Sequence, residues 1–205
     1  MSMRLMIAVP TTDYMHASFV DSLVKLTAEL SRKRIAYSVE IAAGTLVYIA
    51  RNRLASKAVN ENFTHVLWLD SDMVFNENVV DDLLFCEKDM VCGAFVSRRP
   101  PYTPCVYSSL VPGQIEKIKE FGTEPFRVAG CGFACVLTSV ELLKEVFNQF
   151  ATTFQPTAQL GEDLAFCERV NKIGKEIWCD PTVRPGHIAH IPVYAGDDPF
   201  GGALR

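Results

Sequence analysis

The sequence has 205 residues, of which 49% are hydrophobic and 21% are charged, and its formal net charge is −4. This length fits one domain, residues 1–205, with one sizeable core, and the composition excludes a disordered chain. The slight excess of acidic groups disfavours a protein whose main surface binds nucleic acid.

The first half of the chain alternates short apolar runs with segments of helical periodicity. Strands are predicted at residues 5–9, 37–41, 66–69 and 90–95, and helices at residues 17–34, 47–60 and 76–86. Asn76 is the predicted N-cap of the last of these helices. This alternation predicts an α/β fold with a mostly parallel sheet and helices on both faces.

The second half of the chain has a different pattern. Residues 96–133 are rich in Pro and Gly. Beyond them the pattern predicts strands at 134–137 and 176–179, helices at 140–150 and 162–173, and a loop-rich tail from residue 180. Thr138 and Glu141 have the spacing of a capping box for the first of these helices. We interpret residues 1–95 as a nucleotide-binding half. Residues 96–205 would bind the second substrate and perform the chemistry, with the tail as a lid.

The seven cysteines indicate a reducing compartment. Their number is odd, no pair has the C-x₂-C spacing of zinc sites, and most lie in apolar runs. Buried free thiols are typical of the cytosol, so we expect a cytoplasmic protein. No apolar run approaches the roughly 18 residues that span a bilayer, so we expect no transmembrane segment.

Two carboxylates, Asp70 and Asp72, follow directly after the apolar run 66–69. Residues two apart on an extended chain point to the same side, and ligands of open α/β sheets bind at the carboxyl ends of strands. Two carboxylates at such an edge suit Mg²⁺ or Mn²⁺ together with phosphate oxygens. The alternative is an acidic turn that merely closes a core strand.

Other short motifs place polar groups or glycines at the ends of predicted elements. These motifs are Ala50-Arg51-Asn52, Gly130-Cys131-Gly132-Phe133, Gly161-Glu162-Asp163 and Gly186-His187. Each has a structural alternative when taken alone. The two acidic residues at the helix start would complement the helix dipole, the arginine would form a surface ion pair, the histidine would be structural, and the glycines would form turns.

In their order and separation, these motifs together with Pro10 and Asp70-Ser71-Asp72 resemble the GT-A-fold nucleotide-sugar glycosyltransferases. The resemblance covers nearly the whole chain and is strongest to compact bacterial and phage-type relatives of the inverting family 2. It implies a Rossmann-like GT-A fold and metal-dependent transfer of a sugar from a nucleotide-sugar donor to an acceptor hydroxyl, with inversion.

The resemblance also implies roles for individual residues. Asp72 would bind Mn²⁺ or Mg²⁺, Asp70 would face the donor ribose or a metal-bound water, and His187 would complete the metal contacts, with His190 as a rival ligand. Asp163 would be the catalytic base, with Glu162 as the alternative. Donor contacts would come from Pro10, Thr11, Asp13, Arg51, Asp70, Gly130 and Gly132.

Three other functions are compatible with parts of the sequence. A haloacid-dehalogenase-like phosphatase would use Asp70 as its nucleophile, and Gly196-Asp197-Asp198 imitates its late acidic motif. A nucleotidyltransferase would need a Gly-rich basic loop after the first strand, which Pro10-Thr11-Thr12-Asp13 does not provide. A sugar-nucleotide-binding module would bind a donor without turnover. The sequence leaves open the donor sugar, the nucleobase, the oligomeric state and the acceptor, which would be a saccharide, a lipid-linked saccharide, a protein or a modified nucleic-acid base.

Overall fold

A seven-stranded sheet forms the centre of the computed structural model, which describes residues 3–111 and 113–189. The strand order is β2 (Ala36–Ala42), β1 (Arg4–Pro10), β3 (His65–Leu69), β10 (Cys135–Ser139), β5 (Met90–Gly93), β11 (Ile177–Asp180) and β8 (Phe126–Val128). Strands β2, β1, β3, β5 and β11 run in one direction, and β10 and β8 run against them. The prediction of a mostly parallel sheet is confirmed.

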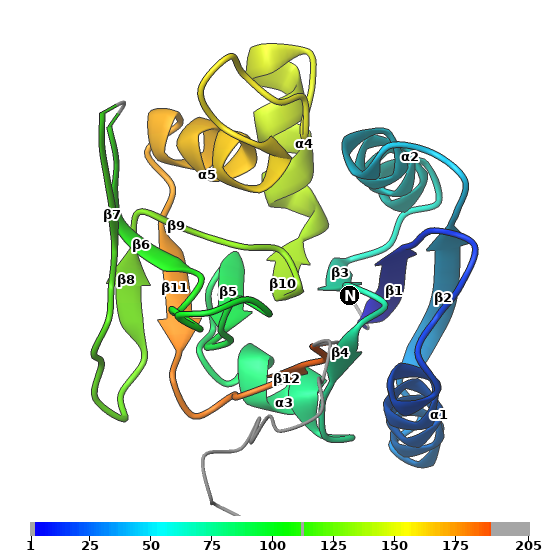
Figure 1. The fold of residues 1–205 in the computed structure, drawn as a ribbon. Coiled ribbons are helices and arrows are strands. Elements are labelled where there is room, and N and C mark those ends of the chain that lie inside the picture. Colours follow the sequence, from blue (N-terminus) through cyan, green and yellow to red (C-terminus); the bar gives the residue numbers. More distant parts are fainter. Residues whose placement is uncertain (1–2, 112, 190–205) are drawn as a thin grey trace, which may run out of the picture.

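Helices cover both faces of this sheet, as predicted (Figure 1). On one face lie α2 (Val47–Asn60), α4 (Val140–Phe150) and α5 (Glu162–Lys172), and on the other lie α1 (Ala17–Arg32) and α3 (Val79–Leu84). Successive side chains of a strand point to opposite faces. In β1, Met6 and Ala8 therefore pack in the core under the first group of helices, whereas Leu5, Ile7 and Val9 pack in the core under the second. Burial on both faces explains why the strands read as unbroken apolar runs.

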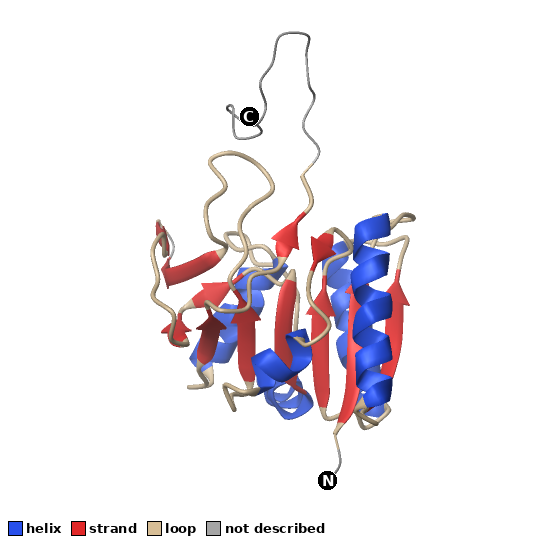
Figure 2. Cartoon of the chain, turned by 90° about the horizontal axis from the view of Figure 1, so that it is seen from below, coloured by secondary structure: helices blue, strands red, loops and turns tan. Residues whose placement is uncertain are grey.

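Two smaller sheets come from segments that the sequence pattern left irregular. The segment 96–133 contains β6 (Val106–Val111), β7 (Gln114–Lys117) and β9 (Gly130–Cys131), which form an antiparallel sheet. The predicted tail contains β12 (Gly186–His187), which pairs with β4 (Met73–Val74). In Figure 2 the β4–β12 pair lies at the end of the molecule toward which the parallel strands point. This pairing brings the tail histidine to the acidic turn.

Two helix starts differ from the predictions. The helix expected from Asn76 begins at Val79, with Asn78 at the N-cap position, while the Asn76 side chain accepts a hydrogen bond from the Asn78 amide at 2.9 Å. The Asn76 side chain thus closes a local turn ahead of the helix, a competing use of short amide side chains.

The second difference concerns α4. Its cap is Ser139, whose hydroxyl accepts a hydrogen bond from the Leu142 amide at 3.1 Å. The Thr138 hydroxyl instead accepts a bond from the buried indole N–H of Trp68 at 3.0 Å. A buried indole N–H requires a hydrogen-bond acceptor. Because the Thr138 hydroxyl serves Trp68, the Ser139 hydroxyl caps the helix.

Among the residues that the structure describes, none of the helices combines the length and apolar character needed to cross a bilayer.

Candidate active site

A buried arginine, Arg51, organises the acidic groups at the carboxyl ends of the parallel strands. Its side chain is 2% exposed. One terminal nitrogen, Nη2, donates to Asp70 Oδ1 at 2.9 Å. The other, Nη1, donates to Asp163 Oδ1 and lies 3.5 Å from Glu162 Oε1. One cation is therefore shared by three carboxylates that come from two distant parts of the sequence.

The local sequence explains how the arginine reaches this position. Arg51 lies in the first turns of α2, and its guanidinium carbon lies 5.2 Å from the centre of the Phe133 ring, a cation–π arrangement. The next residue, Asn52, accepts hydrogen bonds from the Thr153 hydroxyl at 2.6 Å and the Phe154 amide at 2.8 Å. Arg51 thus reaches the acidic cluster while Asn52 anchors the segment that leads toward α5.

Asp163 is held from two sides. It lies in the first turn of α5, where a carboxylate is favoured by the helix dipole. Arg51 donates to one of its oxygens, and the backbone N–H of Phe133 donates to the other at 3.2 Å. The Asp163 side chain is 31% exposed. Its carboxylate is therefore oriented and still reachable from solvent.

Burial changes the acidity of the neighbouring carboxyls. It raises the pKa of Glu162 from 4.5 to about 7, and the charge of Asp163 adds to the rise while Arg51 opposes it. Burial likewise raises the pKa of Asp70 from 3.8 to about 6, against the pull of Arg51. The cluster therefore changes its protonation near neutral pH, a property typical of functional sites.

Asp72 faces a different set of partners from Asp70. Arg98 forms an ion pair with Asp72 Oδ2, and His187 Nε2 lies 3.3 Å from the same oxygen. Burial by itself would raise the pKa of Asp72, but the hydrogen bond with His187 and the charges of His187 and Arg98 outweigh it and leave the pKa below its usual value. Asp72 therefore carries a negative charge that already attracts cations.

The sequence predicts that Asp70 and Asp72 point to the same side of an extended strand, but the structure does not place them in this way. Residues 70–73 form a turn in which the Met73 amide donates to the Asp70 carbonyl at 3.2 Å. The turn directs Asp70 to Arg51 and Asp72 to His187. The structure brings Asp72 and His187 together. The predicted metal-binding roles of Asp70, Asp72 and His187 stay predictions.

His187 is oriented by the backbone. Its Nδ1 lies 2.9 Å from the carbonyl oxygen of Val96, which can only accept, so Nδ1 carries the proton. In the neutral ring, Nε2 then has a free lone pair that faces Asp72. The rival ligand His190 lies outside the described residues, as does most of the predicted tail lid.

Two adjoining hollows meet at Asp70 and Arg98, which line both. One measures about 490 Å³, and its other lining residues include Pro10, Thr11, Tyr14, Leu46 and Asp72. The second measures about 310 Å³, and its other lining residues include Phe95, Tyr107, Gly132, Asp163 and His187. Pro10 and Thr11, which are predicted to contact the donor, line the first hollow, and Asp163, the predicted catalytic base, lines the second.

The structure does not bring every predicted residue to these hollows. Asp13 is exposed and lines neither hollow, and Arg51 lies beneath them. Gly130 also lines neither. A Cβ added there would lie 2.9 Å from a methyl group of Leu110, so this glycine serves close packing. Gly132 does line the second hollow, where a Cβ would lie 2.9 Å from the Phe95 ring.

Sequence reasoning missed Arg98, Tyr14 and Tyr107. Arg98 lies in the Pro-rich segment after β5, and the basic pair Arg98-Arg99 at the end of a predicted strand was the available signal. Tyr14 is 85% exposed beside the first hollow, in the loop after β1. No periodicity distinguishes such loop residues, because their positions depend on tertiary contacts.

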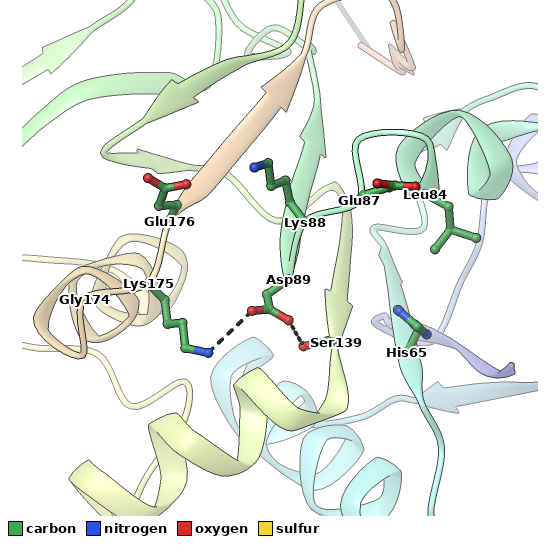
Figure 3. Close-up of a pocket in the computed structure, with 9 residues that line it drawn as sticks. All are labelled: His65, Leu84, Glu87, Lys88, Asp89, Ser139, Gly174, Lys175 and Glu176. Carbon is green, nitrogen blue, oxygen red and sulfur yellow. Dashed lines mark hydrogen bonds and ion pairs between the residues drawn. The ribbon is translucent and has the colours of Figure 1, made fainter. Parts of the chain in front are cut away.

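A third hollow, of about 440 Å³, lies where β3, β5 and β11 begin (Figure 3). Two of its polar contacts involve Asp89: Lys175 Nζ lies 3.5 Å from Asp89 Oδ2, and the Ser139 hydroxyl donates to Asp89 Oδ1 at 2.9 Å. Ligands of open α/β sheets bind at the opposite end of the strands. The candidate site is therefore the pair of hollows around Asp70.

Solved structures share this architecture. A197 from STIV matches with a TM-score of 0.64 at 18% identity, over 93% of this chain and 87% of that chain. GalNAc-T7, in a structure with UDP, GalNAc and Mn²⁺, matches with a TM-score of 0.59 at 13% identity, over 96% of this chain and 45% of that chain. The chain has a GT-A glycosyltransferase fold.

A further structure with the GT-A fold is the catalytic domain of Drosophila β1,4-galactosyltransferase 7 in complex with xylobiose. It matches with a TM-score of 0.54 at 15% identity, over 88% of this chain and 66% of that chain. The chain thus spans less than half of the GalNAc-T7 chain and about two thirds of the galactosyltransferase chain. No protein-family profile and no curated protein sequence matches it.

Proposed function

We propose that this chain transfers a sugar from a nucleoside-diphosphate sugar to an acceptor hydroxyl, with a divalent cation and with inversion at the anomeric carbon. The observation that carries the proposal is the position of Asp163, a held and accessible carboxylate in the hollow that adjoins Asp70, Asp72 and His187. The GT-A fold of the chain supports the reaction class, since two of the structures that share it, GalNAc-T7 and β1,4-galactosyltransferase 7, are glycosyltransferases.

The residues around Asp72 fit a divalent cation. Asp72 presents a carboxylate oxygen 3.3 Å from the Nε2 atom of His187, and the guanidinium of Arg98 already pairs with that oxygen as a cation would. No group of three Asp, Glu, His or Cys side chains within residues 3–111 and 113–189 is placed to hold a metal. A cation held by one or two protein ligands needs oxygens from its substrate, which suits Mg²⁺ or Mn²⁺ with a diphosphate. When bound, the metal would stabilise the charge that develops on the leaving diphosphate.

The donor would occupy the hollow of about 490 Å³. Pro10, Thr11 and Tyr14 would border the nucleoside, and Arg98, at the boundary of both hollows, would contact the diphosphate. A guanidinium is well suited to this contact because it binds phosphate oxygens with two parallel hydrogen bonds. Gly130 is left out of this donor site, because it lines neither hollow.

The chemistry would take place where the two hollows meet. The acceptor oxygen forms a bond to the anomeric carbon while its proton passes to the Asp163 carboxylate. The bond from the anomeric carbon to the phosphate oxygen breaks, and its electron pair leaves with the nucleoside diphosphate. Direct attack from the side opposite the leaving group inverts the anomeric configuration. The phosphatase alternative is not supported, because the fold is of the GT-A type and Asp70, its required nucleophile, is hydrogen-bonded to Arg51.

The test is a panel of UDP- and GDP-sugars assayed for metal-dependent hydrolysis and then for transfer to added acceptors. Asp163→Asn should slow transfer by about 10²–10⁴-fold, the usual loss of general-base help, while UDP affinity measured by calorimetry stays within a factor of about two. Glu162→Gln, the adjacent carboxyl, should lose less.

Three outcomes would contradict the proposal. Full transfer by Asp163→Asn would mean that another group is the base. A retained anomeric configuration in the NMR spectrum of the product would exclude inversion. Donor binding without turnover under every acceptor would instead support a sugar-nucleotide-binding module.

A further inference from the structure

The buried guanidinium of Arg51 connects the two hollows from below. Its Nη2 holds Asp70, which lines both hollows, and its Nη1 holds Asp163, which lines only the smaller one. From these contacts we infer that Arg51 is a positioning residue, which fixes the Asp163 carboxylate relative to the donor side of the site. This inference rests on the proposed function.

The geometry of the clamp requires an arginine. A guanidinium is planar and presents its two terminal nitrogens in a fixed fork, so one side chain reaches two carboxylates in a defined relative orientation. A lysine ammonium at this position would neutralise the same charge but would act as a point charge without the fork. The charge and the orientation supplied by Arg51 can therefore be separated by a single conservative substitution.

The clamp is not optimised for stability. The Arg51 Nε–H is buried and has no hydrogen-bond partner within the described part of the chain, and an unsatisfied buried donor destabilises the folded state. The three carboxylates that Arg51 contacts also outnumber this single cation. An arrangement that gathers carboxylates at a cost in stability is characteristic of functional sites.

Arg51 is expected to act through Asp163 and not through donor binding. It is 1% exposed and lines neither hollow, so it has no surface for contact with the donor. Both oxygens of Asp163 receive a fixed N–H donor, one from Arg51 and one from the Phe133 backbone. Without the first donor, the Asp163 side chain can rotate away from the acceptor, and a misplacement of about 1 Å can cost roughly 10²-fold in rate.

The experiment compares Arg51→Lys with the wild-type protein, using the sugar nucleotide that the donor panel identifies. We expect kcat to fall by about 10- to 100-fold, while the KM for the donor and the calorimetric affinity for UDP with Mn²⁺ stay within a factor of about two. In the Asp163→Asn background, Arg51→Lys should cause no further loss, because residues that act as a unit are not additive.

Arg169→Lys is the matched control. Arg169 is also a buried arginine, and it donates to the carbonyls of Thr153 and Gln155 at 2.9 and 2.6 Å but contacts none of the site carboxylates. The Arg169→Lys variant should have a lower thermal unfolding temperature than the wild-type protein, without a selective loss of kcat. If Arg51→Lys does not fold, Arg51→Gln is the second variant, since its amide retains a donor toward Asp163.

The outcomes distinguish a failure of Asp163 as the proposed base from a failure of Arg51 as its positioning residue. Full activity of Asp163→Asn would refute the proposed base, whatever Arg51 does. Two outcomes would overturn the positioning role alone. In the first, Asp163→Asn is slow, and adding Arg51→Lys lowers its rate by the same factor as in the wild-type protein. In the second, Arg51→Lys weakens UDP binding. Failure of both Arg51 variants to fold, with a folded Arg169→Lys, would assign Arg51 a structural role and also overturn the positioning role.

Discussion

The imidazole Nε2 of His187 lies 3.3 Å from Oδ2 of Asp72, and the pairing of β12 with β4 sets this distance. With Nδ1 committed to the Val96 carbonyl, Nε2 and the carboxylate oxygen face each other as two acceptors unless a proton or a metal ion lies between them. The chain thus provides two ligands of types that divalent cations accept, His187 on β12 and Asp72 in the turn directly before β4.

Asp72→Asn is therefore expected to abolish metal-dependent donor binding. Calorimetry measures the UDP affinity of the wild-type protein and of the variant, once with Mn²⁺ and once with EDTA. Asp89→Asn is the matched control, because Asp89 lies in the hollow at the opposite end of the strands. Unchanged UDP affinity of the wild-type protein in EDTA would show that the metal is not needed.

Arg98→Met should strengthen Mn²⁺ binding in the absence of nucleotide, because the Arg98 guanidinium competes for the Asp72 carboxylate. The Arg98 side chain is 56% exposed, and exposed ion pairs contribute about 0.2–1 kcal/mol, so the gain should be roughly 1.4- to five-fold. The same variant should weaken UDP binding. Arg99→Met is the control within the same loop. If calorimetry shows weaker Mn²⁺ binding by Arg98→Met, the Arg98 guanidinium does not compete with Mn²⁺ for the Asp72 carboxylate.

Glu162→Gln should stabilise the folded protein above neutral pH. Folding raises the pKa of Glu162 from 4.5 to about 7, so between these values the folded state binds more protons than the unfolded state. The free energy of unfolding contributed by this group therefore falls as pH rises through this window. Asp70, whose pKa is raised to about 6, acts in the same direction.

Thermal unfolding at pH 5 and pH 8 measures this effect. The advantage of Glu162→Gln over the wild-type protein should be larger at pH 8 than at pH 5 and should reach a few degrees, since about 1 kcal/mol corresponds to roughly 2–4 °C in a chain of this size. A pH-independent difference between the two proteins would mean that Glu162 is not the titrating group.

Gly132→Ala should disturb the site through a packed ring. The added Cβ would lie 2.9 Å from Phe95 Cζ, and the Phe95 ring packs edge-on against His187 with centroids 6.1 Å apart. Overpacking of this kind costs about 1–3 kcal/mol, and Mn²⁺ affinity should fall with it. Gly122→Ala is the control, because nothing lies within 4 Å of its Cβ position. Equal unfolding temperatures for the two variants would contradict this packing argument.

Local sequence patterns determined much of the fold and the types of residue at the site. Buried strands read as apolar runs, and the helices show apolar periodicity, because burial selects side chains one element at a time. The same patterns placed Asp70 and Asp72 after β3 and placed Glu162 and Asp163 in the first turn of α5, where the structure has them.

The partners of those residues were decided only by the tertiary structure. The antiparallel strand β10 inserts between β3 and β5, and the tail adds β12 to β4. The proximity of Asp72 to His187 was expected only from the family resemblance. Strand pairing across long stretches of sequence leaves no local periodicity, so no local pattern could indicate that Asp72 meets Arg98. Arg51 read as a surface or donor-binding residue for the same reason. Its burial between Asp70 and Asp163 depends on how α2, β3 and α5 pack together, and no single element encodes that arrangement.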